Sequence, residues 1–289
     1  MVAEVWEKIF SICFSIGSTM CATRPLTDKE YAECFDAFKK VSSEWMAMDE
    51  WLEKELIPCL EGRPSARVLS VGSGTGDFDL TLMRMLLEKI SQISYVALDP
   101  NQEHNAIFSQ RYHDCGLELR SFQIIPQPFG QERLDGGFDL IHLTHCLYYI
   151  PDRRTAIRRA YELLNPGGFL LIFHQTTLGI NEIQRAYMKL VKGDEKEMFS
   201  AHDIALIFEG LGLKFNYDVL VSDIDVTDCI DENETGRKIL NFFLESNLDG
   251  IDSSLRKEII QKMKEICRYE NGRYFLFHPC GIFWIKKMA

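Results

Sequence analysis

The sequence predicts an α/β fold in which helices cover both faces of a mostly parallel, doubly wound sheet. Two observations support this fold class. An apolar, β-branched run at residues 68–71 breaks into a glycine-rich turn before an amphipathic segment resumes, and later apolar runs follow at 94–98, 138–143 and 169–173. A strand, a turn and a helix in this order are typical of a parallel β-α-β unit, whose ligands bind beyond the carboxyl ends of the strands.

The first turn has the sequence Gly72-Ser73-Gly74-Thr75-Gly76. Glycine lets the backbone take a positive φ and approach a ligand closely, and the N–H groups of the next helix face the same point. The spacing G-x-G-x-G matches neither the dinucleotide fingerprint nor the phosphate-binding P-loop. We interpret Gly72, Ser73, Gly74 and Gly76 as a candidate cofactor loop, and a tight turn without a ligand is the alternative.

The second strand ends on an acidic residue. Asp99 follows Ser94-Tyr95-Val96-Ala97-Leu98 and lies 23 positions after Gly76. A carboxylate at the carboxyl end of this strand can accept hydrogen bonds from both ribose hydroxyls of a nucleoside that crosses the sheet. Because Asp99-Pro100 also suits the start of a helix, an N-cap is the alternative, and the two roles are compatible.

Composition and charge narrow the class of partner. The net charge of −11 over 289 residues argues against nucleic acid and anionic membranes as partners and favours a small, cationic molecule. The nine cysteines are scattered and never fall in C-x-x-C spacing, which predicts reduced thiols, a cytoplasmic protein and no metal site. The apolar stretch Ile9–Ile16 is too short to span a bilayer, so we expect an amphipathic helix or an arm there.

The chain divides into an N-terminal arm, residues 1–27, and one domain, residues 28–289, with added helices at 28–60 and 230–270. In the first of these helical regions, aromatic residues recur at helical spacing at Tyr31, Phe35 and Phe38. Further helices are expected at 182–191, 201–210, 237–248 and 255–267, and one last strand at 274–285.

These elements, in this order, resemble the class I S-adenosylmethionine-dependent methyltransferases. The resemblance is carried by the glycine loop, the acidic strand end, Phe138-Asp139-Leu140-Ile141, and Pro166-Gly167-Gly168 before a further strand. It implies a Rossmann-like sheet of seven strands and S-adenosyl-L-methionine as the cofactor.

Outside this common core the chain is similar to the histamine N-methyltransferases over nearly all of residues 28–286. The motifs that carry this similarity are Glu30-Tyr31 with Phe35, Ser42-Ser43-Glu44, Leu147-Tyr148-Tyr149, Leu211-Gly212-Leu213-Lys214, Asp228-Cys229 and Phe243-Leu244. The similarity implies a monomeric N-methyltransferase that acts on a small amine or an imidazole-type substrate. An O- or peptide-directed methyltransferase on the same scaffold and a cofactor-binding pseudoenzyme are the alternatives.

The resemblance also assigns cofactor contacts, residue by residue. It gives Gly72 and its loop to the methionine part, Asp99 to the ribose, His104 and Gln127 to the adenosine, and Thr144 to the transferred methyl. The family has Glu where this chain has Asp99, a change of one methylene that keeps the charge.

On the substrate side the resemblance implies an aromatic enclosure around an anionic anchor, Glu44. Ring faces and a carboxylate hold a cationic amine more strongly in a pocket that excludes water. Core packing on an amphipathic helix is the alternative for Tyr31 and Phe35. The residues of the predicted enclosure are Tyr31, Phe35, Tyr148, Tyr149 and Phe243.

The chain departs from the histamine enzymes where the substrate binds. A Gln beside the fourth-strand Thr and an Asn on the last strand are replaced by His145 and Pro279, and the neighbouring His278 is a less suitable substitute because adjacent strand residues point to opposite faces. Histamine is therefore a doubtful substrate. We predict Glu44 and His145 as catalytic residues in an in-line methyl transfer, with His145 accepting the proton; a positioning role for His145 is the alternative.

Overall fold

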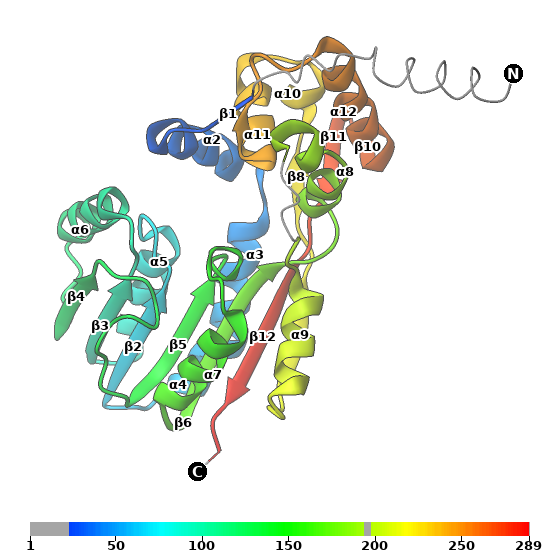
Figure 1. Ribbon diagram of the computed structural model, residues 1–289. Coiled ribbons are helices and arrows are strands. Elements are labelled where there is room, and N and C mark those ends of the chain that lie inside the picture. The colour runs from blue at the N-terminus through cyan, green and yellow to red at the C-terminus, as the bar shows by residue number, and fades with distance from the viewer. Residues whose placement is uncertain (1–22, 194–197, 289) are drawn as a thin grey trace, which may run out of the picture.

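The computed structural model describes residues 23–193 and 198–288, so the predicted Ile9–Ile16 segment lies outside the described residues. A seven-stranded sheet with the order β4-β3-β2-β5-β6-β12-β7 forms the centre of the molecule (Figure 1). β12 pairs antiparallel with β6 and β7, and the remaining neighbours pair parallel, which confirms the predicted fold class. The strands are Ser65–Val71 (β2), Gln92–Leu98 (β3), Ser121–Ile125 (β4), Phe138–Thr144 (β5), Leu164–Gln175 (β6), Asn216–Leu220 (β7) and Cys280–Lys286 (β12).

Helices cover both faces of this sheet because successive strand residues point to opposite sides. Val68 of β2 faces a core formed with α3, α4, α5 and α6, whereas its neighbour Leu69 faces a core formed with α7 and α9. The bounds are Glu44–Trp51 (α3), a π-helical turn at Leu52–Leu56, Ile57–Leu60 (α4), Asp77–Leu87 (α5), Gln102–Cys115 (α6), Arg153–Leu163 (α7) and Ala201–Gly210 (α9).

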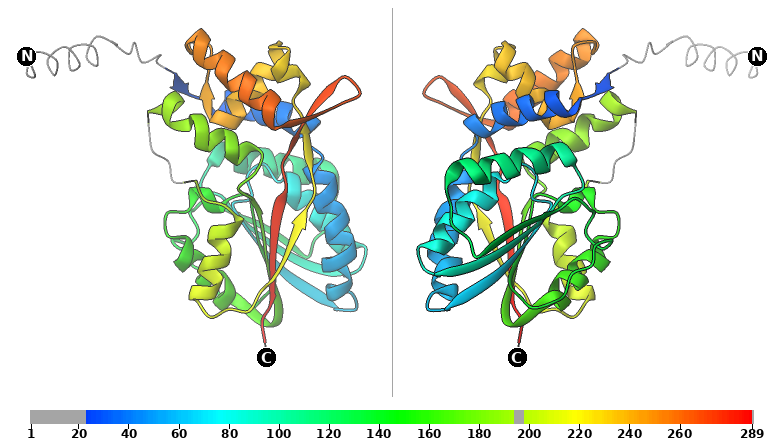
Figure 2. Two further views of the ribbon diagram at one scale, coloured as in Figure 1. Left: turned by 90° about the vertical axis from the view of Figure 1, so that its right-hand side faces the viewer. Right: turned by 90° about the vertical axis from the view of Figure 1, so that its left-hand side faces the viewer.

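A third core lies beyond the carboxyl ends of the parallel strands, in a unit that we call the helical lobe (Figure 2). Its helices pack around a small antiparallel sheet with the order β10-β11-β8. Lys39 of the lobe forms an ion pair with Asp77 at the start of α5, which connects the lobe to the segment that follows the carboxyl end of β2. The elements of the lobe are Arg24–Pro25 (β1), Asp28–Val41 (α2), Ile180–Lys192 (α8), Asp223–Asp225 (β8), Thr227–Ile230 (α10), Glu234–Leu244 (α11), Ser246–Asn247 (β9), Ser253–Ile266 (α12), Cys267–Glu270 (β10) and Arg273–Phe277 (β11).

The prediction of one last strand at 274–285 is wrong. The segment forms two strands in different sheets: β11 pairs with β8 in the lobe, and β12 pairs with β6 and β7 in the main sheet. The break falls at His278-Pro279, where the proline has no N–H to donate to a ladder. The chain therefore passes from the lobe into the main sheet at this dipeptide.

The predicted helix at 237–248 also ends earlier than expected. α11 stops at Leu244, because Glu245 takes a left-handed conformation with φ of 49° and β9 follows at once. β9 pairs antiparallel with β1, next to the start of α2.

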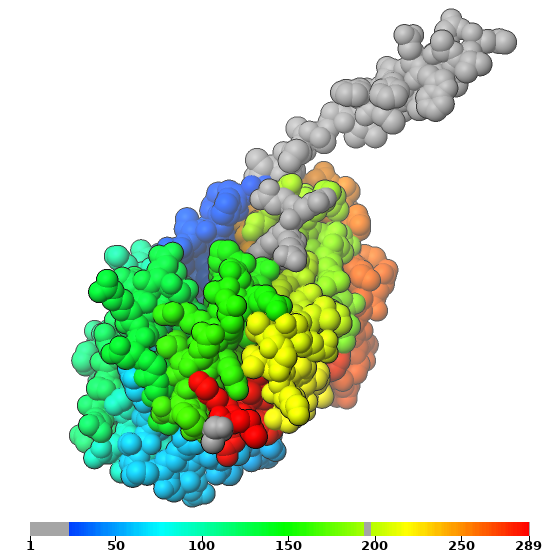
Figure 3. Space-filling model, turned by 60° about the horizontal axis from the view of Figure 1, so that its bottom comes forward, coloured from blue at the N-terminus to red at the C-terminus, as the bar shows by residue number. Residues whose placement is uncertain are grey.

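At the end of the molecule opposite the lobe, the last residues of β12 lie beside the α9–β7 segment (Figure 3). Among the described residues we find no helix with the length and apolar character that crossing a bilayer requires.

Packing within the lobe gives a stability prediction. Gly236 of α11 lies so close to α10 that an added Cβ would be 2.0 Å from the Asp228 carbonyl oxygen. We expect Gly236→Ala to lower the free energy of unfolding by about 1–3 kcal/mol, as overpacking does. Urea unfolding measures the change. Gly136→Ala is the control, since its Cβ would be 3.6 Å from the nearest atom, the Leu163 carbonyl oxygen. Equal stability of the two variants would contradict this packing.

Candidate active site

A cavity of about 700 Å³ lies between the carboxyl ends of the parallel strands and the helical lobe. The loops after β2, β3 and β5 form its floor, and α2 contributes part of its wall. The predicted site residues that line this cavity are Tyr31, Phe35, Glu44, Gly72, Ser73, Gly74, Asp99, His104, Gln127, Thr144, His145, Tyr148, Tyr149 and His278. Gly76, Phe243 and Pro279 do not line it.

The glycine loop has three positive φ angles, 70° at Gly72, 54° at Gly74 and 76° at Gly76. A Cβ on Gly72 would meet Cys146 at 2.4 Å, and one on Gly76 would meet Phe108 at 2.1 Å, so these two glycines allow close packing behind the loop. A Cβ on Gly74 would meet nothing within 4 Å. Gly74 is therefore the point at which the backbone leaves room for a ligand in the cavity.

Asp99 is 8% exposed and holds the loop in place. Its Oδ2 accepts a hydrogen bond from the Gly74 N–H at 3.0 Å, and its Oδ1 accepts one from the Asn101 N–H at 2.8 Å. The alternative that Asp99 caps the next helix is wrong, because Asn101 is the N-cap of α6 and its side chain accepts from the Glu103 and His104 N–H groups. Asp99 thus connects the two loops that border this side of the cavity.

Aromatic side chains of α2 and of the segment after β5 meet across the cavity. The hydroxyls of Tyr31 and Tyr149 lie 3.4 Å apart, and the rings of Tyr31 and Phe35 are stacked at 6.4 Å. On α11 the structure differs from the prediction by one residue. Phe243 is fully buried, whereas Phe242 lines the cavity, with its ring 5.7 Å from that of Tyr31. Adjacent residues on a helix point about 100° apart, so only one of the pair faces the cavity.

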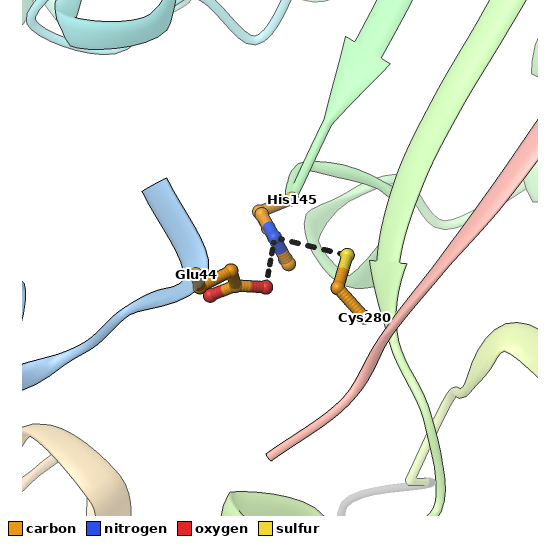
Figure 4. A group of neighbouring side chains, drawn as sticks. All are labelled: Glu44, His145 and Cys280. Atoms are coloured by element: carbon orange, nitrogen blue, oxygen red, sulfur yellow. Dashed lines mark hydrogen bonds and ion pairs between the residues drawn. The ribbon is translucent and has the colours of Figure 1, made fainter. Parts of the chain in front are cut away.

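Glu44, His145 and Cys280 come together from three distant parts of the chain (Figure 4). Glu44 begins α3 and is 3% exposed, and its Oε1 lies 3.0 Å from His145 Nε2. Cys280 begins β12, and its Sγ lies 3.7 Å from the same nitrogen. The other ring nitrogen, Nδ1, lies 2.9 Å from the Tyr148 hydroxyl. Both nitrogens of His145 therefore have partners.

Burial and neighbouring charges set the protonation of Glu44 and Cys280. Burial by itself would raise the pKa of Glu44, but attraction to His145 and to His278 lowers that pKa to about 2, so the carboxylate is ionised at neutral pH. Burial and the nearby Glu44 carboxylate raise the pKa of the Cys280 thiol well above its usual value. The cluster thus combines a buried anion, an imidazole and a neutral thiol.

A second buried polar group lies beneath Thr144. The Tyr95 hydroxyl donates to Asp79 Oδ1 at 2.9 Å and lies 2.9 Å from His142 Nε2, while His142 Nδ1 lies 3.2 Å from the Thr144 hydroxyl. Burial lowers the pKa of His142 to about 3, so this ring is neutral. With the Tyr95 proton directed to Asp79, Nε2–H donates to Tyr95 and the Thr144 hydroxyl donates to Nδ1. The lone pairs of Thr144 then remain for the cavity.

We expected His278 to be a less suitable substitute because it would lie on a strand next to Pro279. The structure instead places His278 in the break between β11 and β12, and it lines the cavity, while Pro279 does not. Its Nδ1 accepts a hydrogen bond from the Ile180 N–H at 3.3 Å.

Cys280, His142, Asp79 and Phe242 belong to the site or lie beside it but were not predicted from the sequence. No spacing could have revealed Cys280, because 135 positions separate it from His145. His142 had a weak signal, since it is a polar residue between the apolar residues Ile141 and Leu143 of a predicted strand.

Comparison with known proteins places this geometry in a family. The methyltransferase domain family matches residues 45–217 of the chain. Carnosine N-methyltransferase 2 of Gallus gallus is 27% identical over 237 residues, which cover 76% of this chain and 73% of that protein. Histamine N-methyltransferase of Mus musculus is 27% identical over 262 residues, which cover 81% of this chain and 86% of that protein.

Solved structures agree on the fold. The YcgJ protein from Bacillus subtilis has a TM-score of 0.56 at 17% identity, over 83% of this chain and 100% of that one. Phosphoethanolamine N-methyltransferase 2 of Haemonchus contortus has a TM-score of 0.50 at 18% identity, over 83% of this chain and 53% of that one. The chain therefore belongs to the methyltransferase domain family and is a histamine N-methyltransferase-like class I S-adenosylmethionine-dependent methyltransferase.

Proposed function

We propose that this protein transfers a methyl group from S-adenosylmethionine to a nitrogen of a small amine or imidazole-type acceptor. One observation carries the proposal. The same cavity has the open glycine loop with Asp99 on one side and the buried Glu44 carboxylate with aromatic rings on the other. Relatives named histamine and carnosine N-methyltransferases support the choice of acceptor class.

The residues on the loop side fit the cofactor. Gly74 leaves open room, the Ser73 hydroxyl is buried without a hydrogen-bond partner, and the Asp99 oxygens have lone pairs left after their contacts with backbone N–H groups. We assign the methionine part to Gly72, Ser73 and Gly74 and the ribose to Asp99. When bound, S-adenosylmethionine supplies a methyl group activated by a positive sulfur.

The other residues that we assign to the cofactor line the same cavity. By the family resemblance, His104 and Gln127 lie on the adenosine side and Thr144 lies nearest to the transferred methyl. The hydroxyl of Thr144 is oriented by His142, which leaves its oxygen to accept from a ligand.

The residues on the acceptor side fit a cation. Glu44 is ionised and almost fully buried, and burial strengthens its attraction to a positive group that enters the cavity. The ring faces of Tyr31, Phe35 and Phe242 add cation–π attraction. A buried carboxylate of this kind selects an amine over a neutral alcohol.

We propose that the acceptor ammonium loses its proton through Tyr148 to His145. Because His145 Nε2 faces Glu44 and Nδ1 faces the Tyr148 hydroxyl, the group presented to the acceptor is the phenol, not the imidazole. The Tyr148 oxygen takes the ammonium proton as its own proton passes to Nδ1. Glu44 then stabilises the imidazolium, and the free nitrogen lone pair is aligned for attack.

The first test concerns Asp99. Asp99→Ala removes a charged acceptor and the contact that holds Gly74, so we expect S-adenosylmethionine to bind roughly 10- to 150-fold more weakly. Titration calorimetry measures the change. Asp114→Ala, which changes an exposed carboxylate near the end of α6, is the matched control and should bind as the wild type does. Unchanged affinity in Asp99→Ala would sink the assignment of this side of the cavity.

The second test concerns Glu44. Glu44→Gln keeps the shape and removes the charge, so kcat/KM for a cationic acceptor should fall roughly 10- to 100-fold while cofactor affinity stays the same. Steady-state kinetics and calorimetry separate the two effects. Glu50→Gln, on the exposed face of the same helix, serves as the control. If Glu44→Gln keeps its kcat/KM for the best acceptor, Glu44 is not the amine anchor.

The third test concerns the acceptor itself. Histamine enzymes use a Gln where this chain has His145, whose ring nitrogens already face Glu44 and Tyr148, and a histamine ring nitrogen buried without that partner is costly. In a screen of amines, imidazoles and peptides with a labelled methyl donor, we expect histamine to have a kcat/KM roughly 10- to 100-fold below that of the best amine. Histamine as the best acceptor, with turnover unchanged in His145→Ala, would refute this expectation.

A further inference from the structure

We propose that Glu44, His145 and Cys280 form a binding site for a divalent transition metal, with Zn²⁺ as the best match. The three side chains offer one oxygen, one nitrogen and one sulfur, and these atoms all lie within 4.8 Å of one another (Figure 4). Carboxylate, imidazole and thiolate are the ligands that Zn²⁺ uses in proteins, whereas Mg²⁺ and Ca²⁺ prefer oxygen alone. This donor set therefore selects a borderline-soft cation.

The separations match a tetrahedral centre. Around Zn²⁺ with ordinary bond lengths, neighbouring nitrogen, oxygen and sulfur ligands lie roughly 3.4–3.6 Å apart. In the protein His145 Nε2 lies 3.0 Å from Glu44 Oε1 and 3.7 Å from Cys280 Sγ. Shifts of a few tenths of an ångström, within reach of side-chain rotation, bring these two pairs to those distances, and the third pair, Glu44 and Cys280, has ligand atoms within 4.8 Å of each other.

The burial of the Glu44 Oε1 atom is a second observation in favour of a bound cation. Oε1 receives no well-directed hydrogen bond from the described residues, although His145 Nε2 lies 3.0 Å away. A buried carboxylate oxygen with unused lone pairs is costly, and a cation beside it relieves that cost. This observation is independent of the donor set.

The surroundings support His145 as a ligand through Nε2. With metal on Nε2 the ring proton sits on Nδ1, where the Tyr148 hydroxyl, 2.9 Å away, accepts it. The Cys280 thiol is protonated in the metal-free protein, so binding of Zn²⁺ releases one proton from Sγ to solvent. The bound cation then balances the charges of one carboxylate and one thiolate.

Three protein ligands leave a fourth position for a tetrahedral ion. Glu44 and His145 line the cavity, so that position opens toward it. A metal here takes the place of the ammonium group against Glu44. Zn²⁺ should therefore compete with the cationic acceptor and not with the cofactor, and this consequence rests on the function proposed above.

The test is metal binding by the full chain, measured without methyl transfer. Purified protein, reduced with a phosphine and freed of metal, is titrated with Co²⁺ alone and with Zn²⁺ alone. We expect the intense visible bands of tetrahedral Co²⁺ with a thiolate-to-cobalt charge-transfer band, lost on addition of one equivalent of Zn²⁺.

Variants tie the signal to these residues. His145→Gln and Cys280→Ser should each weaken Zn²⁺ binding by about 100-fold or more, and Tyr148→Phe by about 10- to 100-fold, since loss of an outer-shell partner alone has that effect. Cys59→Ser, which removes an exposed thiol, is the matched control and should leave both signals unchanged. If Cys280→Ser does not fold, His145→Gln decides the question.

Two results would overturn the proposal: a wild-type spectrum without the charge-transfer band, or Zn²⁺ affinity that is equal in the wild type and His145→Gln. A failure of the function proposed above looks different, because the protein then binds Zn²⁺ but methylates no amine. With the best acceptor in hand, Zn²⁺ inhibition should raise the KM for the acceptor and leave that for the cofactor unchanged.

Discussion

The buried carboxylate of Glu44 is the constraint on which this site depends. An ionised group that is 3% exposed needs a positive or hydrogen-bonding partner, and among the described residues His145, with Nε2 at 3.0 Å, His278 and the Cys280 thiol lower the pKa of this carboxyl. A further cation beside Glu44 would lower the cost of burying this charge. An ammonium group and a divalent metal satisfy the same requirement, which is why the two proposals meet at one residue.

The architecture explains how such a group can be buried. Three separate cores, two on the sheet and one in the helical lobe, leave a cavity where they meet, and the lobe covers the carboxyl ends of the parallel strands. At His278-Pro279 the chain passes from β11 of the lobe into β12 of the main sheet and so connects the lobe with the sheet. The same passage places Cys280 at the first position of β12, next to His145.

The two sides of the cavity are organised by different means. On the side that we assign to the cofactor, the backbone shapes the glycine loop through three positive φ angles and the hydrogen bond that the Gly74 N–H donates to Asp99. On the side that we assign to the acceptor, side chains from α2, α3 and the segment after β5 meet, and hydrogen-bonded pairs such as His145 with Tyr148 fix their orientation. A loop shaped by its backbone is readable in sequence, whereas a meeting of distant side chains is not.

The sequence by itself determined the fold class, the glycine loop and the acidic strand end, because local propensity and spacing within about 30 residues encode a β-α-β unit. It also indicated the helices at 28–60, and most of the site residues that it predicted line the cavity. Tertiary structure alone decided the rest. It selected Phe242 over Phe243, divided residues 274–285 between two sheets, and brought Cys280 to His145 across 135 positions. These outcomes depend on which face of an element is buried and on contacts between distant segments, and local sequence determines neither.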